Sequence, residues 1–262
     1  MIGKATLTNE QYHKSPGISS SGLVKFIQYS PAHYKAYLTE PREQTDAMAL
    51  GSAIHMAILE PNLFESTYVC KPQDMSFATK EGKEWKSKNA GKSILAFDKF
   101  ETCLRIRDKF NKSPILKAYV SGGEAESSWF WEDPQTGLVC KCRPDYLIGN
   151  TILDIKTTED CRPNHFQYQI RKYRYDVQSA FYVRGMEKCL GSKVNFLHVV
   201  VEKNAPFEVS VYQLDEASIE RASLDVHNAL FQMKECMDKN EWPGYDYSVK
   251  PVSLPSDMFF IE

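Results

Sequence analysis

The stretch that decides the fold is RPDYLIGNTILDIK, residues 143–156. Its two β-prone halves flank Gly149-Asn150, a dipeptide typical of a two-residue β-hairpin turn. If these two residues form the turn, the register places Asp145 opposite Asp154. Directly opposed residues have Cβ atoms about 4.5–5.5 Å apart. The hairpin therefore predicts two carboxylates side by side.

Two carboxylates at that distance repel each other, and a shared proton or a cation between them relieves the repulsion. Side-chain alternation favours the cation, because Asp154 and Lys156 share one face of the strand. Leu153 and Ile155 point to the opposite, apolar face. Oxygen ligands completed by water suit Mg²⁺, for which Mn²⁺ can substitute. Lys156 could orient or deprotonate a water for attack on a phosphodiester, or stabilise the developing charge.

Pro144 bears on the pairing in this hairpin. The same register places Arg143 opposite Lys156. A proline inside a strand marks a bulge or an edge because it has no N–H to donate, so the register can shift here by one residue. The plainer interpretation is an exposed hairpin whose charged side chains are only solvated. The second carboxylate and the apolar reverse face favour a site.

The rest of the chain alternates helical and strand patterns. Helices are predicted over 22–27 behind three N-capping serines, from 30–31 onward, over 50–59, over most of 78–117, and at about 163–189 and 215–239. Strands are predicted over 127–131, 138–148, 151–156, 193–202 and 208–214. The fold class is α/β or α+β, with a central mixed sheet flanked by helices.

We expect a single domain over residues 1–262. Its parts are a helical N-terminal region to about residue 120, a sheet core over about 121–215 that carries the catalytic residues, and a C-terminal helix and tail over about 216–262. The composition, 42% hydrophobic and 25% charged, is typical of a globular protein. No apolar run approaches the length of a membrane span, and the N-terminal residues lack the apolar stretch of a secretory signal, so we expect a cytoplasmic protein that does not associate with a membrane. The seven scattered cysteines favour reduced thiols.

Charge is uneven along the chain, although the formal net charge is only -2. Residues 80–117 hold 11 Lys or Arg against five Asp or Glu, and a second basic cluster over 162–174 is mixed with aromatic residues. Such a mixture suits a nucleic-acid groove, and a solvated helical face is the plain alternative. Serines at a helix start could bind a terminal phosphate, although N-capping explains them equally well. The candidate DNA contacts are Ser20, Ser21, Arg143, Arg171, Lys172 and Arg174.

With Pro144-Asp145 and Asp154-Ile155-Lys156, the chain resembles the PD-(D/E)XK nucleases, which share a restriction-endonuclease-like core. It is similar to their RecB-like branch and to the RecE-type exonucleases within it (the exodeoxyribonuclease VIII nuclease domain). Residues 50–55 resemble the Gly-x-x-x-His motif of that branch, and residues 178–182 resemble its Gln-x-x-x-Tyr motif. Residues 18–22 and 30–34 resemble the RecE-like N-terminal pattern. The similarity spans about residues 10 to 240.

The resemblance implies that Asp145, Asp154 and the carbonyl of Ile155 hold the metal. It makes Lys156 the catalytic lysine and His55 a further ligand or a close neighbour. Ordinary core packing is the plain alternative for His55.

Three more positions follow from the resemblance. Gln178 and Tyr182, one turn apart on a helix, would brace the site and touch DNA, or else only pack. An upstream acidic residue is implied, and we expect Glu126 rather than Glu124 because it directly precedes the strand over 127–131. The iron–sulfur cluster of some relatives is not expected, because the last two cysteines lie far apart in the sequence.

The implied function is a Mg²⁺-dependent 5′→3′ exonuclease that digests linear double-stranded DNA and leaves 3′ single-strand tails for recombination by annealing. The implied partners are DNA ends, a RecT-like single-strand annealing protein, and further copies of the chain in a toroidal trimer or tetramer. Two other interpretations stay open: a structure- or sequence-specific endonuclease on the same core, and a non-enzymatic DNA-end-binding scaffold. The presence of both aspartates and the lysine speaks against the scaffold.

Overall fold

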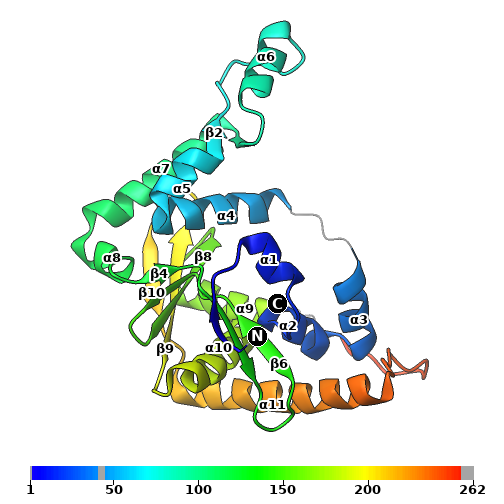
Figure 1. The fold of residues 1–262 in the computed structure, drawn as a ribbon. Coiled ribbons are helices and arrows are strands. Elements are labelled where there is room, and N and C mark those ends of the chain that lie inside the picture. The colour runs from blue at the N-terminus through cyan, green and yellow to red at the C-terminus, as the bar shows by residue number, and fades with distance from the viewer. Residues whose placement is uncertain (1, 41–44, 255–262) are drawn as a thin grey trace, which may run out of the picture.

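A five-stranded mixed sheet lies at the centre of the computed structural model, which describes residues 2–40 and 45–254 (Figure 1). In spatial order its strands are β10 (Val209–Tyr212), β9 (Asn195–Glu202), β8 (Thr151–Thr158), β7 (Tyr146–Ile148) and β4 (Glu124–Ala125). β8 and β9 run parallel, and the other neighbours in this sheet are antiparallel. The predicted central mixed sheet is confirmed.

Two smaller sheets accompany it. One is antiparallel and contains β1 (Gly3–Ala5), β5 (Ser128–Glu132) and β6 (Val139–Cys142); the other is a parallel pair, β2 (Tyr68–Cys70) and β3 (Ser93–Leu95). The predicted single strand over 138–148 is wrong, because β6 pairs with β5 whereas β7 pairs with β8. Pro144 lies in the break, where its missing N–H could not have continued a ladder. Residues 1–120 are also less purely helical than predicted, since they contain β1, β2 and β3.

Helices account for much of the remaining chain. They are α1 (Asn9–Lys14), α2 (Ser20–Gln28), α3 (Pro31–Thr39), α4 (Asp46–Leu59), α5 (Pro61–Thr67), α6 (Lys80–Lys88), α7 (Phe97–Lys112), α8 (Pro114–Tyr119), α9 (Pro163–Tyr173), α10 (Tyr175–Leu190) and α11 (Glu216–Lys239). The predicted start signals hold: Ser19 caps α2, and Ser30 caps α3 ahead of Pro31. The predicted helix over about 163–189 is two helices, because Arg174 between α9 and α10 takes a left-handed φ of 54°.

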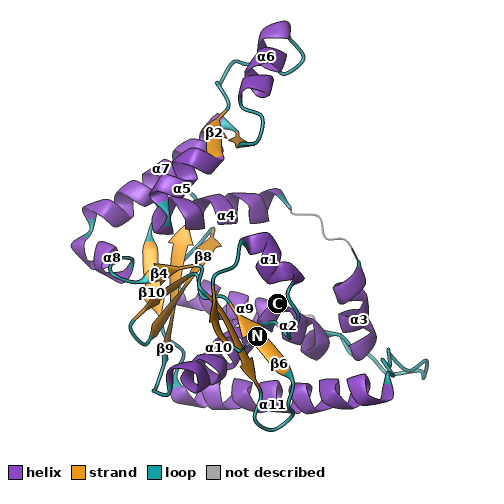
Figure 2. Cartoon of the chain, viewed as in Figure 1, coloured by secondary structure: helices purple, strands orange, loops and turns teal. Residues whose placement is uncertain are grey.

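The sheet separates two apolar cores. α4, α5 and α7 lie over one face, and α10 and α11 lie over the other (Figures 1 and 2). β8 contributes to both cores by alternation: Leu153 and Ile155 pack with the residues of α4 and α7, whereas Ile152 packs with those of α10 and α11. The apolar face predicted for Leu153 and Ile155 is therefore confirmed. No helix in the described ranges is both long enough and apolar enough to cross a membrane.

Helix α10 is held close to the smaller antiparallel sheet. The ring of Trp131 on β5 lies against Gly185 on α10, so close that a Cβ built on Gly185 would be 2.5 Å from the ring. Trp131 also packs on Phe181 of the same helix, with ring centroids 4.9 Å apart. This contact sets the position of α10, which carries Gln178 and Tyr182.

Candidate active site

The hairpin has the predicted register. Tyr146 pairs with Leu153 and Ile148 with Thr151, so Gly149 and Asn150 form the turn. Gly149 has a φ of +54°, a conformation that glycine adopts at no steric cost at the first central position of such a turn. The ladder stops at Tyr146, so Asp145 lies just outside it.

Asp145 is held across the hairpin by its side chain. Its Oδ2 accepts a hydrogen bond from the backbone N–H of Ile155, at 2.7 Å. Its carbonyl accepts one from the backbone N–H of Glu126, at 3.0 Å. The ladder does not reach the predicted pairing of Arg143 with Lys156; Arg143 instead donates from Nε to Oε2 of Glu126, at 2.8 Å. Asp145 and Asp154 are therefore not the directly opposed pair of the ladder that the sequence predicted. Asp145 is linked instead to Ile155, the residue that follows Asp154.

Three side chains converge to form a candidate metal centre. His55 on α4, Glu126 after β4, and Asp145 before β7 each offer a ligand atom, and these atoms lie within 4.8 Å of one another. Nδ1 of His55 is 3.4 Å from Oδ2 of Asp145. Glu126 has a φ of 52°, which is uncommon for a residue with a side chain and is often found at functional sites. We call these three residues the metal triad.

The structure separates the two upstream acidic residues. Glu124 is half-exposed and forms an ion pair with Lys4. Glu126 belongs to the metal triad. Of the two, Glu126 is the one whose carboxylate lies close to Asp145.

The electrostatics of the metal triad fit a bound cation. Burial and the neighbouring Asp145 raise the pKa of Glu126 to about 7, although Arg143 opposes the shift. Burial also raises the pKa of Asp145; His55 opposes that shift and Asp154 adds to it. Carboxylates that are hard to ionise because they are buried together are stabilised in their charged form by a cation between them. One imidazole and two carboxylates are a suitable donor set for a divalent ion.

A second cluster of three side chains adjoins the first. Nζ of Lys156 is 2.6 Å from Oδ2 of Asp154 and donates to Oε1 of Gln178 at 3.0 Å. Nε2 of Gln178 donates to Oδ1 of Asp154 at 2.7 Å. These contacts close a ring of three residues, which we call the lysine cluster. The sequence-predicted residues Asp154, Lys156 and Gln178 are thus brought together.

Asp154 and Lys156 of the lysine cluster are both charged at neutral pH. Burial alone would raise the pKa of Asp154, but Lys156 and His198 hold it well below its usual range. Burial alone would lower the pKa of Lys156, but Asp154 raises it above its usual value. Lys156 is therefore an ammonium in this arrangement, suited to stabilising negative charge or orienting a water rather than to accepting a proton.

His198 is a site residue that the sequence does not reveal. It lies on β9, directly beside Asp154 on β8, and is fully buried. Nδ1 is 3.4 Å from Oδ2 of Asp154, and Nε2 is 3.0 Å from the hydroxyl of Ser179 on α10. The only signal was that His198 is a polar residue inside an apolar strand, which does not say what it faces.

Tyr182 and Ile155 are the other two predicted site residues at the hairpin. The phenol of Tyr182 is buried and donates to the carbonyl of Arg143, at 3.4 Å. Burial raises the pKa of Tyr182 well above its usual value, so it stays neutral. The side chain of Ile155 is in the core, and its N–H binds Asp145. The role of the Ile155 carbonyl as a metal ligand stays a prediction.

A cavity of about 1080 Å³ opens beside the metal triad. It is lined by Glu126 and Arg143 at one place and by Ser20 and Ser21, at the start of α2, at another. Within the described residues, Nη1 of Arg143 is buried and has no hydrogen-bond partner. Three predicted DNA contacts therefore share one cavity with a metal-triad residue.

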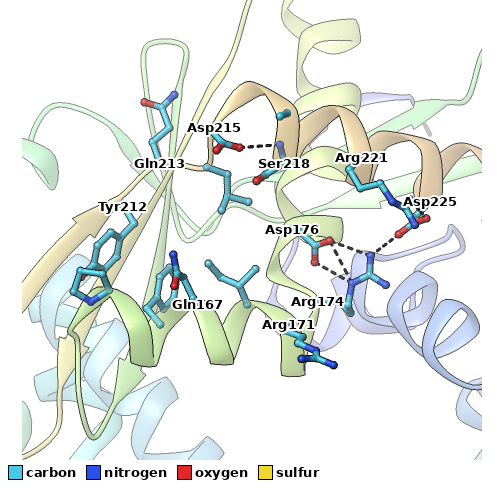
Figure 3. Close-up of a pocket in the computed structure, with 15 residues that line it drawn as sticks. Gln167, Arg171, Arg174, Asp176, Tyr212, Gln213, Asp215, Ser218, Arg221 and Asp225 are labelled. Carbon is cyan, nitrogen blue, oxygen red and sulfur yellow. Dashed lines mark hydrogen bonds and ion pairs between the residues drawn. The ribbon is translucent and has the colours of Figure 1, made fainter. Parts of the chain in front are cut away.

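The predicted contacts Arg171, Lys172 and Arg174 lie elsewhere, on and after α9. Arg171 and Arg174 line a groove of about 860 Å³ between α9 and the start of α11, which contains no metal-triad residue (Figure 3). Figure 3 shows the guanidinium of Arg174 between two carboxylates: it is 3.0 Å from Asp176 and 2.6 Å from Asp225. A phosphate would have to compete with both carboxylates. The DNA contacts of these three residues stay predictions.

Comparison with known proteins gives an independent result. The family model described as "PDDEXK-like domain of unknown function (DUF3799)" matches residues 19–249. A candidate exonuclease from Eubacterium rectale is 16% identical, with a TM-score of 0.65 over 95% of this chain and 97% of its own, which shows a shared fold. A phage-related exonuclease from Haemophilus somnus is 14% identical, with a TM-score of only 0.38 over 86% of this chain and 96% of its own. No curated protein matches the sequence.

Proposed function

The chain belongs to the family described as a PDDEXK-like domain of unknown function (DUF3799), and from that premise we propose that it is a metal-dependent nuclease. One observation carries the proposal: the metal triad and the lysine cluster meet on a single hairpin. Asp145 of the triad binds the N–H of Ile155, between Asp154 and Lys156 of the cluster. A cation held by such ligands and a fixed ammonium can both stabilise the negative charge that develops during phosphodiester hydrolysis.

His55, Glu126 and Asp145 would hold the metal, and Asp154, whose charge acts on Asp145, is the further proposed ligand. A divalent cation bound there supplies a water of lowered pKa and neutralises phosphate charge. Mg²⁺ is the proposed ion, with Mn²⁺ as a substitute, because carboxylate oxygens dominate the donor set.

Lys156 would act on the charge that develops on the phosphate. Its ammonium is already oriented by Asp154 and Gln178, so little reorganisation is needed when negative charge appears. It also lies 4.4 Å from the ring of Tyr175, which restricts its movement on a further side. Gln178 keeps the carboxylate and the ammonium in register by binding both.

The proposed substrate is linear double-stranded DNA, digested 5′→3′ to leave 3′ single-strand tails. The cavity beside Glu126 supports recognition of a strand end, because it connects the candidate metal centre to the N-terminus of α2. Backbone N–H groups at a helix N-terminus attract phosphate, and Arg143 offers a cation at the same cavity. The same proposal includes a RecT-like annealing partner, a toroidal oligomer and a cytoplasmic location. A near-neutral chain is compatible with a ring, because only the channel lining needs positive charge.

The test is digestion of a linear duplex labelled separately at its 5′ and 3′ ends, alongside a closed circular duplex, with Mg²⁺ and with EDTA. The proposal expects early loss of the 5′ label, intact circles and no activity in EDTA. Early loss of the 3′ label would reverse the polarity, and nicked circles would favour an endonuclease. Binding to DNA ends without any cleavage would instead favour the scaffold interpretation.

A further inference from the structure

One part of the molecule projects away from the layers that hold the candidate active site. Residues 68–95 contain β2, α6 and β3, and α6 lies at the end of this segment farthest from the central sheet (Figure 1). We call this segment the arm. It rises from α5 and α7, whose apolar side chains share a core with those of α4, the helix that carries His55.

The arm is ordered by its own contacts. β2 and β3 pair in parallel, and the N–H of Lys71 donates to the carbonyl of Leu95 at 2.8 Å. At the tip, the rings of Phe77 and Trp85 are stacked with centroids 6.2 Å apart. Helix α6 lies so close to the preceding turn that a Cβ on Gly82 would be 2.1 Å from the carbonyl oxygen of Ser76. The tip is therefore a built element that can hold side chains in fixed positions.

The charge of the arm contrasts with that of the whole chain. Residues 71–92 contain six lysines and three acidic residues, a balance of +3, whereas the complete chain has a net charge of -2. Lys80 forms a weak ion pair with Glu84 at 4.0 Å. Across residues 2–40 and 45–254, no carboxylate forms an ion pair with Lys83, Lys86 or Lys92.

These three lysines border one hollow. A depression of about 450 Å³ at the C-terminal end of α6 is lined by Lys83, Lys86 and Lys92, together with the small or polar residues Ser87, Asn89 and Gly91. Lys83 and Lys92 are exposed, and Nζ of Lys86 is 5.6 Å from the ring of Phe77. A depression whose lining residues include three lysines and no carboxylate suits a polyanion.

We propose that the arm binds the phosphate backbone of the DNA duplex outside the active site. The inference rests on the proposed function, which supplies a substrate with one negative charge per about 1.7 Å of duplex. Lysines that neutralise phosphates release counterions, so their contribution is seen in the salt dependence of binding. The base of the arm and α4, which carries His55, pack into the same apolar core. DNA bound to the arm would therefore keep a fixed position relative to the cleavage site.

The experiment compares two double variants of equal charge change. Lys83→Gln with Lys92→Gln alters the arm, and Lys234→Gln with Lys239→Gln alters α11, at the opposite end of the molecule in Figure 1. Dissociation constants for a long duplex are measured in EDTA over a range of salt concentrations. The arm variant should bind about ten-fold more weakly at moderate salt. The plot of its log association constant against log salt concentration should be less steep, by about two in the slope. The α11 variant should match the wild type.

Cleavage with Mg²⁺ at saturating DNA separates this inference from the proposed function. The arm variant should keep the wild-type maximal rate, since α6, at the far end of the arm, lies well away from α4, the helix that carries His55 (Figure 1). Wild-type protein that binds DNA but never cleaves it would contradict the nuclease proposal and leave the salt slopes to decide on the arm. Equal salt slopes for the arm variant and the wild type would overturn the inference. So would an arm variant that changes oligomeric state with an unchanged slope, because the arm would then be a protein interface.

Discussion

Nδ1 of His198 lies 3.4 Å from Oδ2 of Asp154, and both side chains are buried. The other ring nitrogen of His198 is 3.0 Å from the hydroxyl of Ser179, which itself donates to the carbonyl of Tyr175. The carboxylate of Asp154 thus has three side-chain partners: His198, Lys156 and Gln178. A carboxylate with so many partners has a fixed orientation.

His198→Ala should weaken divalent-metal binding and cleavage by about 10- to 100-fold each, because partners that orient ligand side chains contribute about that much. Mn²⁺ affinity measured directly by titration, together with the maximal cleavage rate, would check this. Ser179→Ala is the matched control: it removes only the distant partner and should have a smaller effect on both quantities. Unchanged Mn²⁺ affinity in a folded His198→Ala protein would contradict the role.

Lys156→Ala should reduce the single-turnover cleavage rate by about 10²- to 10³-fold, the usual cost of losing one charge-stabilising group. The affinity for uncleaved DNA in EDTA should change little, since one buried ammonium contributes little to backbone binding. Lys156→Arg should restore only part of the rate, because the larger planar guanidinium cannot replace the ammonium between Asp154 and Gln178. Wild-type cleavage by Lys156→Ala would exclude the lysine cluster as the catalytic centre.

Glu126 should make the metal-free protein sensitive to pH. Its pKa rises from the usual 4.5 to about 7 in the folded protein. The folded state then binds the proton more tightly than the unfolded state. The resulting stabilisation is present below pH 4.5 and is lost as the pH rises through about 7.

The stabilisation amounts to at most about 3 kcal/mol in the free energy of unfolding. Metal-free Glu126→Gln should therefore be more stable than the wild type at pH 8, measured by denaturant unfolding in EDTA. It should also lose metal affinity, which in the wild type should increase with pH up to about 7. Glu124→Gln, the matched control, should behave as wild type in both measurements. An identical pH profile for Glu126→Gln and wild type would show that this carboxyl is not the titrating group.

Two glycine substitutions should have different consequences. Gly185→Ala puts a Cβ into the ring of Trp131 and should destabilise the protein by about 1–3 kcal/mol. Gly51→Ala, on α4, meets Thr157 Oγ1 only at an ordinary 3.5 Å and should stabilise the helix by up to about 1 kcal/mol. Thermal unfolding of both variants tests this pair. If folded Gly51→Ala lost cleavage, the space above Gly51 would be part of the DNA path.

Local sequence rules were sufficient for the hairpin. The Gly149-Asn150 turn, the register and the two faces of β8 all follow from a two-residue turn and a period of two. The same local rules were insufficient at Pro144. There the chain leaves one sheet for another, and the sequence pattern alone does not say which strand β6 pairs with.

The amino-acid sequence by itself determined the hairpin, the shared face of Asp154 and Lys156, and the start signals of α2 and α3. These depend on neighbours within a few residues, where backbone geometry leaves few choices. Only the tertiary structure decided that His55, Glu126 and Asp145 meet, and that His198 faces Asp154. Both results depend on which elements pack together: α4 on one face of the sheet, and β9 parallel to β8 after a long crossover. Such contacts join residues that are tens of positions apart, so they are set by burial of the whole core and not by any local pattern.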